Sequence, residues 1–146
     1  ELGITLPETP APIANYVPFV KTGNLVYLSG LGPAAGSGGT IPKGKLGLDM
    51  TVEEGYEAAR LVGINILSRI KGAIGDLDKV KRVIKLLTMV NSTVNFDQHP
   101  TVANGCSDLM VEVFGEKGRH ARSAVGMAGL PNGIPVEIEV IIEVED

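Results

Sequence analysis

Residues 121–144 read ARSAVGMAGLPNGIPVEIEVIIEV, and this stretch decides the fold. Apolar residues occupy alternate positions of its second half, from Val136 to Val144, and most residues between them are glutamates. Successive side chains of a strand point to opposite faces of a sheet, so the pattern predicts a strand with one buried and one mostly acidic face. Asn132-Gly133 is typical of a two-residue turn, and we expect residues 121–130 and 134–144 to pair as a β-hairpin.

Two helices and a strand are predicted before this hairpin. Thr51-Val52-Glu53-Glu54 has the spacing of a capping box, and apolar residues then recur every three or four positions as far as Gly75. A second segment of helical spacing begins near Pro100 and ends at Gly115. Residues 80–90 between them are rich in β-branched and aliphatic side chains, which predicts a strand covered on much of both faces.

The first fifty residues predict a hairpin and two irregular segments. Residues 16–21 and 25–29 carry β-branched and aromatic side chains on either side of a Thr22-Gly23-Asn24 turn. The prolines of residues 1–12 predict an extended arm outside the core, and the glycines of residues 30–47 predict a mobile loop.

The predicted elements follow one another as ββ-α-β-α-ββ within a single domain of residues 1–146. This order indicates an α+β fold, a mixed sheet with both helices on one face. The opposite face of the sheet would be amphipathic and uncovered, and we therefore expect the protein to associate with itself.

The composition argues against several classes of function. Hydrophobic residues make up 44% of the 146 residues and charged residues 21%, which is typical of a soluble globular domain with no membrane partner. A net charge of −4 and an aromatic content of 4% argue against nucleic-acid binding. A single cysteine, Cys106, excludes an internal disulfide and is most simply a core residue. We expect a cytoplasmic protein that acts on a small molecule.

Arg122 is the strongest candidate for binding that molecule. It lies among small and apolar residues, which leave space for a ligand, and its planar guanidinium matches a carboxylate. The pattern alone favours a simpler role, an ion pair with Glu143 or another strand carboxylate. Glu137 could act as a general base, although one glutamate on an acidic face is more often only solvated.

The sequence gives little support for other catalytic or cofactor-binding motifs. It contains no Walker A loop, dinucleotide-binding turn or zinc helix, and its two histidines are too scattered for a typical zinc site. A Ser/His/Asp triad could use Ser29 or Ser123 with His120, but no spacing brings these residues together.

Several stretches resemble a known family. They are Ala121-Arg122-Ser123-Ala124-Val125, Gly129-Leu130-Pro131 and Val136-Glu137-Ile138-Glu139, supported by Asn15-Tyr16, residues 23–30 and Asn104. In these stretches the chain is similar to the RidA/YjgF family of reactive-imine deaminases, historically also labelled endoribonucleases or translation inhibitors. The resemblance covers nearly the whole chain. It implies a chorismate-mutase-like fold, a homotrimer with clefts between subunits, and no metal or organic cofactor.

The same resemblance implies roles for single residues. Arg122 falls on the family's arginine for the substrate carboxylate, and Glu137 falls on the glutamate that orients the hydrolytic water. The sequence departs from the best-known members at Leu31, where glutamine is usual, and at Ala124, where cysteine is frequent. The substrate-binding positions are Tyr16, Ser29, Gly30, Asn104 and Ala124.

The reaction implied is hydrolysis of 2-imino or enamine acids to 2-keto acids and ammonia. Two alternatives remain open at this point. One is a non-enzymatic protein on the same trimeric fold that binds keto acids or other small metabolites or acts as an interaction protein. The other, suggested by the older family names, is RNA cleavage or translation inhibition, which the acidic composition and the few aromatic residues disfavour.

The expected C-terminal hairpin also predicts where the site lies. With Asn132-Gly133 as the turn, Arg122 would face Glu143 and would lie six strand positions from Glu137, which is ~20 Å. One small substrate could not contact both residues in one chain. A complete site would therefore need Arg122 of one subunit and Glu137 of its neighbour.

Overall fold

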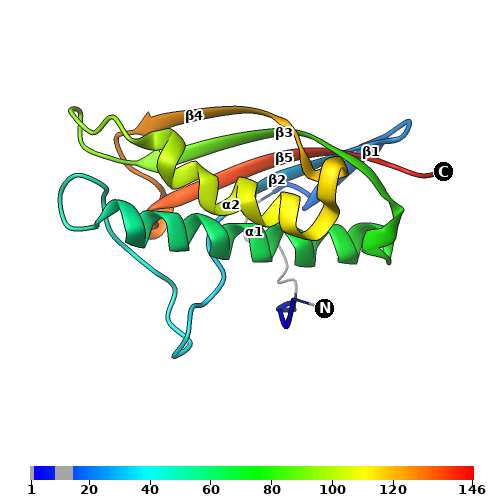
Figure 1. Cartoon of the computed structure of the whole chain (residues 1–146), viewed down its shortest axis with the longest axis horizontal. Coiled ribbons are helices and arrows are strands. Elements are labelled where there is room, and N and C mark those ends of the chain that lie inside the picture. The colour runs from blue at the N-terminus through cyan, green and yellow to red at the C-terminus, as the bar shows by residue number, and fades with distance from the viewer. Residues whose placement is uncertain (1, 9–14) are drawn as a thin grey trace.

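Five strands form one mixed sheet in the order β1-β2-β5-β3-β4, and two helices cover one of its faces (Figure 1). The structure is a computed structural model that describes residues 2–8 and 15–146. Its elements are β1 Phe19–Thr22, β2 Leu25–Leu31, α1 Val52–Ile74, β3 Val80–Asn91, α2 His99–Phe114, β4 Ala121–Met127 and β5 Val136–Val144. The short 3-10 turns are η1 Leu77–Lys79, η2 Gly115–Gly118 and η3 Pro131–Gly133.

This architecture confirms the α+β fold and the order ββ-α-β-α-ββ, with both helices on one face. Within the described residues, no helix is long and apolar enough to cross a membrane. Cys106 is fully buried in the core, as predicted, and burial raises the pKa of its thiol to about 12.

The predicted C-terminal hairpin is wrong, because β3 lies between β4 and β5. β3 pairs with β5 in antiparallel fashion and with β4 in parallel fashion. Asn132 and Gly133 do turn the chain with positive φ values of 59° and 69°, but inside η3, on a connection that crosses past β3. Turn residues specify a local bend, but they do not determine which strand pairs with the strand that follows the turn. The densely apolar β3 gains more from a central position than β4, whose small residues and Arg122 suit an edge.

Helix α1 begins and ends where its sequence predicts. The Thr51 N–H donates to Glu54 Oε1 at 2.9 Å, and the Glu54 N–H donates to Thr51 Oγ1 at 3.1 Å, so the capping box is formed. Gly75, with φ 86°, provides the C-terminal cap. The buried face of α1 includes Val62, Ile66 and Ile70, which form the core together with the apolar side of β5.

The two helices cross at a pair of glycines. A Cβ atom added to Gly105 of α2 would overlap the backbone carbonyl of Tyr56 of α1, and one added to Gly63 of α1 would lie 2.8 Å from Leu109 Cδ2. Both helices can approach this closely because neither glycine carries a side chain. Beside the crossing, the Tyr56 hydroxyl donates to Asp108 Oδ2 at 2.7 Å.

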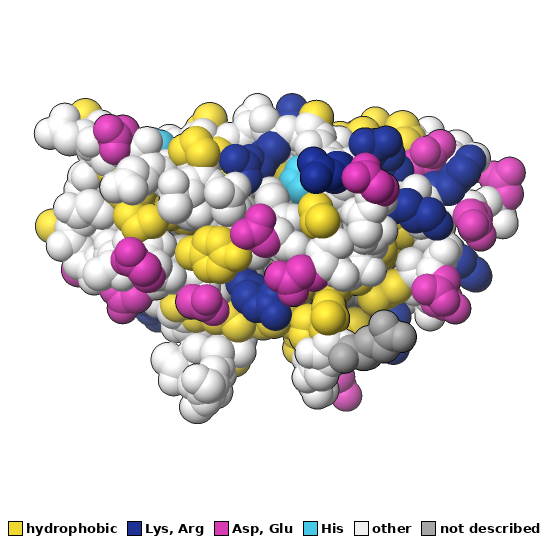
Figure 2. All heavy atoms as spheres, viewed as in Figure 1, with side chains coloured by type: hydrophobic (Ala, Val, Ile, Leu, Met, Phe, Trp, Pro, Cys, Tyr) yellow, Lys and Arg dark blue, Asp and Glu magenta, His cyan; other side chains and the backbone are white. Residues whose placement is uncertain are grey.

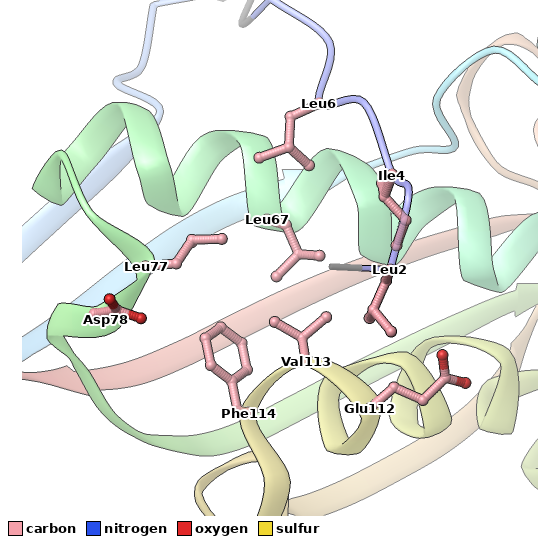
Figure 3. Close-up of a pocket in the computed structure, with 9 residues that line it drawn as sticks. All are labelled: Leu2, Ile4, Leu6, Leu67, Leu77, Asp78, Glu112, Val113 and Phe114. Carbon is pink, nitrogen blue, oxygen red and sulfur yellow. The ribbon is translucent and has the colours of Figure 1, made fainter.

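The N-terminal arm contributes to the core more than its prolines predict. Its described part, residues 2–8, has no helix or strand, but Ile4 and Leu6 pack against the core. Leu2, Ile4 and Leu6 point toward a cavity of about 350 Å³ between α1 and the end of α2 (Figure 3). The rest of the predicted arm, residue 1 and residues 9–12, lies outside the described residues.

The segment of residues 30–47 is anchored at its end, so the prediction of a mobile loop is wrong there. Leu46 is completely buried, and its N–H and C=O groups bond to the backbones of Asn91 and Thr93. Lys45 Nζ also donates to Asn91 Oδ1 at 2.5 Å and to the Ala128 carbonyl at 2.6 Å. The buried Leu46 side chain, the backbone hydrogen bonds of Leu46 and the Lys45 ammonium group thereby attach this loop to the end of β3.

Candidate functional site

The structure places the sequence-predicted site residues in two separate groups. Arg122, Asn104 and Ala124 lie where the edge strand β4 meets α2, and we call this group the arginine cluster. Tyr16, Gly30 and Glu137 line a cavity beside β2, which we call the glutamate cavity. Ser29 lies next to this cavity, where its hydroxyl donates to the Val17 carbonyl at 2.6 Å and fixes the segment that carries Tyr16.

Arg122 is held by side chains of α2. It pairs in register with Leu86 of β3, whose side chain is buried under the helices, so Arg122 points to the same face of the sheet. Its Nη1 donates to Asn104 Oδ1 at 2.8 Å and to Ser107 Oγ at 3.1 Å. Ala124, two positions further along β4, lies on the same face and adds only a methyl group beside this cation.

The predicted ion pair of Arg122 with Glu143 does not form. Glu143 lies on the central strand β5, opposite Leu25 on one side and Arg82 on the other. Over residues 2–8 and 15–146, no carboxylate forms an ion pair with Arg122. The guanidinium is thus oriented by two neutral side chains and keeps an unneutralised charge, which is what binding an external carboxylate requires.

A serine and a histidine complete the arginine cluster, and their pairing was not predicted from the sequence. His120 Nδ1 lies 2.5 Å from the Gly118 carbonyl, and Nε2 lies 2.9 Å from Ser107 Oγ. Burial lowers the pKa of His120, which favours the neutral ring. Because a carbonyl only accepts, Nδ1 carries the proton, and the Ser107 hydroxyl donates to Nε2 while it accepts from Arg122.

The spacing on α2 could have indicated this cluster. Asn104 and Ser107 are three positions apart and therefore lie on one face of the helix, one turn from each other. The cluster opens into a cavity of about 420 Å³. Figure 2 shows Lys and Arg side chains, with a histidine among them, gathered over α2 and the β4 edge.

Glu137 in the glutamate cavity lies directly over the backbone of Gly30. β2 has an irregular register between Leu28 and Leu31, and a Cβ atom on Gly30 would overlap Glu137 Oε2. A glycine is therefore required at position 30 for the carboxylate to lie where it does. Burial raises the pKa of Glu137, and the neighbouring Glu139 raises it further.

An arginine of α1, which was not predicted from the sequence, also lines the glutamate cavity. The cavity has a volume of about 530 Å³, and Asn65, Ser68 and Arg69 form its α1 side. Arg69 is 8% exposed, and its Nε has no hydrogen-bond partner within the described residues. A charged residue beside the apolar Ile70 normally extends to solvent, so helical spacing alone did not indicate it.

Arg122 and Glu137 lie far apart within one chain, although not for the reason that the hairpin suggested. Arg122 is level with Leu86 and Glu137 is level with Met89, three positions along β3, and two strand spacings separate β4 from β5. These offsets place the backbone positions of Arg122 and Glu137 ~14 Å apart. Because the offset of three positions is odd, the two side chains also point to opposite faces of the sheet.

The described residues contain no group of three or more His, Cys, Asp or Glu side chains that could hold a metal ion. The functional groups that the structure does bring together are guanidinium, hydroxyl, imidazole, amide and carboxylate groups. They suit the binding of a small carboxylate and the transfer of protons.

Comparison with known proteins identifies the family. Residues 1–135 match the family model described as "YjgF/chorismate mutase-like, putative endoribonuclease". The chain belongs to the YjgF/RidA family. Its fold is accordingly the chorismate-mutase-like fold of that family, as the sequence resemblance implied.

Relatives of this YjgF/RidA protein carry different names. Protein TCP17 of Trypanosoma cruzi is 47% identical and matches 99% of this chain and 91% of its own length. The 2-iminobutanoate/2-iminopropanoate deaminase of Dermatophagoides farinae is 30% identical over 97% of this chain and 95% of its own. The structure of Atu1372 from Agrobacterium tumefaciens, a protein of unknown function, is 48% identical, with a TM-score of 0.90 over 99% of this chain and 88% of that chain.

Proposed function

We propose that this YjgF/RidA protein hydrolyses 2-imino acids and their enamine tautomers to 2-keto acids and ammonia. The observation that carries the proposal is Arg122, a cation that Asn104 and Ser107 orient and that no described carboxylate neutralises. The similarity to the deaminase of Dermatophagoides farinae supports the same reaction.

In the proposed mechanism Arg122 binds the substrate carboxylate through two hydrogen bonds and so fixes the imine carbon. Glu137 accepts a hydrogen bond from a water molecule and takes its proton as the water oxygen attacks that carbon. That proton passes to the nitrogen, which gives a carbinolamine with one hydroxyl and one amino group. Glu137 then takes the hydroxyl proton and delivers it to the amino group, and the C–N bond breaks as the C=O bond forms, which releases ammonia and the keto acid. The raised pKa of Glu137 suits a group that must accept a proton and return it.

Tyr16 and Gly30 assist in this mechanism. Both line the glutamate cavity, so the Tyr16 hydroxyl and the Gly30 N–H are available to orient the substrate and the water. Reactive imines hydrolyse without a catalyst, and positioning of the two reactants is therefore enough to accelerate the reaction.

The proposal includes a homotrimer in which neighbouring subunits share each site. Arg122 and Glu137 of one chain lie too far apart for one small substrate. The sheet face opposite the helices exposes apolar side chains, including Val20, Tyr27 and Val125, and a second copy would cover them. In such an assembly Arg122 of one subunit acts with Glu137 of the next.

The experiment measures keto-acid release from imines that an amino-acid oxidase generates in situ. We expect Arg122→Ala and Glu137→Gln to lower the enzyme-dependent rate by roughly 10²-fold or more, because each removes a group that acts on the reacting molecule. Arg60→Ala is the matched control, since Arg60 is a partly exposed residue of α1 outside both groups of site residues and forms an ion pair with Glu112 at 4.0 Å. Equal rates for the wild type and Arg122→Ala would reject the proposal. Keto-acid binding without any imine hydrolysis would instead indicate a binding protein.

A further inference from the structure

Arg69 has an unusual environment for a charged residue of a helix. It follows Ser68 on α1, is 8% exposed, and lines the glutamate cavity. Its Nε is buried and has no hydrogen-bond partner among residues 2–8 and 15–146. Burial lowers the pKa of its guanidinium, whereas Tyr16 acts in the opposite direction. The cation is therefore held in a place that disfavours its charge.

The described residues around Arg69 do not compensate that charge. Glu137 and the exposed Glu8 are the carboxylates of the cavity wall, and neither forms an ion pair with Arg69. Asn65 uses its amide N–H to donate to the Gly32 carbonyl at 2.9 Å. A buried cation without a counter-ion is unfavourable, and an anionic ligand bound beside it would offset that cost.

The cavity beside Arg69 is large enough for such a ligand. Its volume of about 530 Å³ exceeds what a few water molecules need, and small-molecule sites commonly have a few hundred Å³. Gly30 and Glu137, the groups placed at the hydrolytic water, line the same cavity. An anion bound to Arg69 would therefore belong to the molecule whose imine carbon lies near Glu137.

We infer that Arg69 binds a second carboxylate of the substrate, so that the preferred substrates are 2-imino acids derived from acidic amino acids. This inference rests on the proposed function, in which Arg122 of a neighbouring subunit binds the first carboxylate. Arg69 takes no part in bond making. It is a specificity residue, and its planar guanidinium provides two parallel donors for the side-chain carboxylate.

The experiment compares two imines of equal chain length, made by oxidation of glutamate and of norvaline. We expect Arg69→Gln to lower kcat/KM for the glutamate-derived imine by about 10²-fold and for the norvaline-derived imine by less than about 3-fold. Arg69→Lys should restore part of the preference, because it keeps the charge but not the planar fork. Arg60→Gln is the control for the same change elsewhere on α1, and thermal unfolding confirms that each variant is folded.

A binding measurement separates this inference from the proposed function. Calorimetry with 2-oxoglutarate and 2-oxopentanoate, the two products, requires no turnover. We expect the wild type to bind 2-oxoglutarate at least about 10-fold more tightly and Arg69→Gln to lose that difference. Equal losses on both imines, or equal binding of both keto acids, would overturn the inference and leave imine hydrolysis intact. Selective binding of 2-oxoglutarate through Arg69 without hydrolysis of either imine would overturn the proposed function and keep the dicarboxylate site.

Discussion

The burial of Glu137, which suits its proposed catalytic role, lowers the stability of the folded protein. Burial, and then Glu139, raise the pKa of its carboxyl group in the folded protein. In the window between the ordinary pKa and the raised value, the unfolded chain releases a proton that the folded chain retains. The contribution of Glu137 to stability therefore falls as pH rises through this window, and it stays lower at neutral pH.

Because the Glu137 charge is buried, we expect Glu137→Gln to lower turnover and to raise stability. The variant should lose imine hydrolysis and yet melt at a higher temperature than the wild type at pH 7.5, because glutamine carries no charge to bury. The gain should shrink toward pH 4, where the wild-type carboxyl group becomes protonated. Thermal unfolding at both pH values measures the difference. Glu145→Gln, at an exposed position, is the control, and a gain of equal size at both pH values would contradict the explanation.

The residues of the candidate site differ in how well the sequence alone predicts them. Arg122 and Glu137 could be selected from the sequence because their residue types and their family resemblance both indicate chemistry. The spacing of Ser107 from Asn104 indicates a shared helix face, but the pairing of Ser107 with His120 and the burial of Arg69 depend on contacts between segments separated in sequence. His120 reaches Ser107 only because η2 folds back over the end of α2, where Gly118 lies against the Met110 carbonyl.

Among the elements, the crossing of α1 and α2 depends on Gly105. A Cβ atom there would overlap the Tyr56 carbonyl, which belongs to the backbone of a rigid helix and cannot move aside alone. We expect Gly105→Ala to lower the free energy of unfolding by about 1–3 kcal/mol, despite the better helix propensity of alanine. Chemical denaturation measures the loss. Gly129→Ala, where a Cβ would meet no atom within 4 Å, should change stability little.

The elements also show which parts of the fold the sequence determines locally. The limits of α1 follow from its capping box and Gly75, and β5 follows from its alternation of apolar and acidic residues. The partner of β4 does not follow from local sequence. It depends on which strand gains most from a central position, and this is a property of the whole sheet.

For the whole molecule, the main prediction concerns a site shared between subunits. Arg122→Ala and Glu137→Gln should each be inactive alone, but a mixture of both chains should regain activity. With equal amounts of two chains in a cyclic trimer, about a quarter of the interfaces combine an intact Arg122 with an intact Glu137. Keto-acid release after joint refolding should therefore recover to about a quarter of the wild-type rate.

The control for this experiment is each variant refolded alone, and sedimentation of the mixture verifies the trimer. Mixtures that stay inactive although trimers form would show that one chain supplies both residues. A monomeric wild type that hydrolyses imines would lead to the same conclusion.

The N-terminal arm has a practical consequence for handling the protein. Leu2, Ile4 and Leu6 point toward α1 and α2, so removing them would expose an apolar surface and promote aggregation. The opposite end emerges beyond β5, and Asp146 lies clear of the sheet (Figure 1). Affinity tags and fluorescent labels are therefore better attached after Asp146 than in place of the first residues.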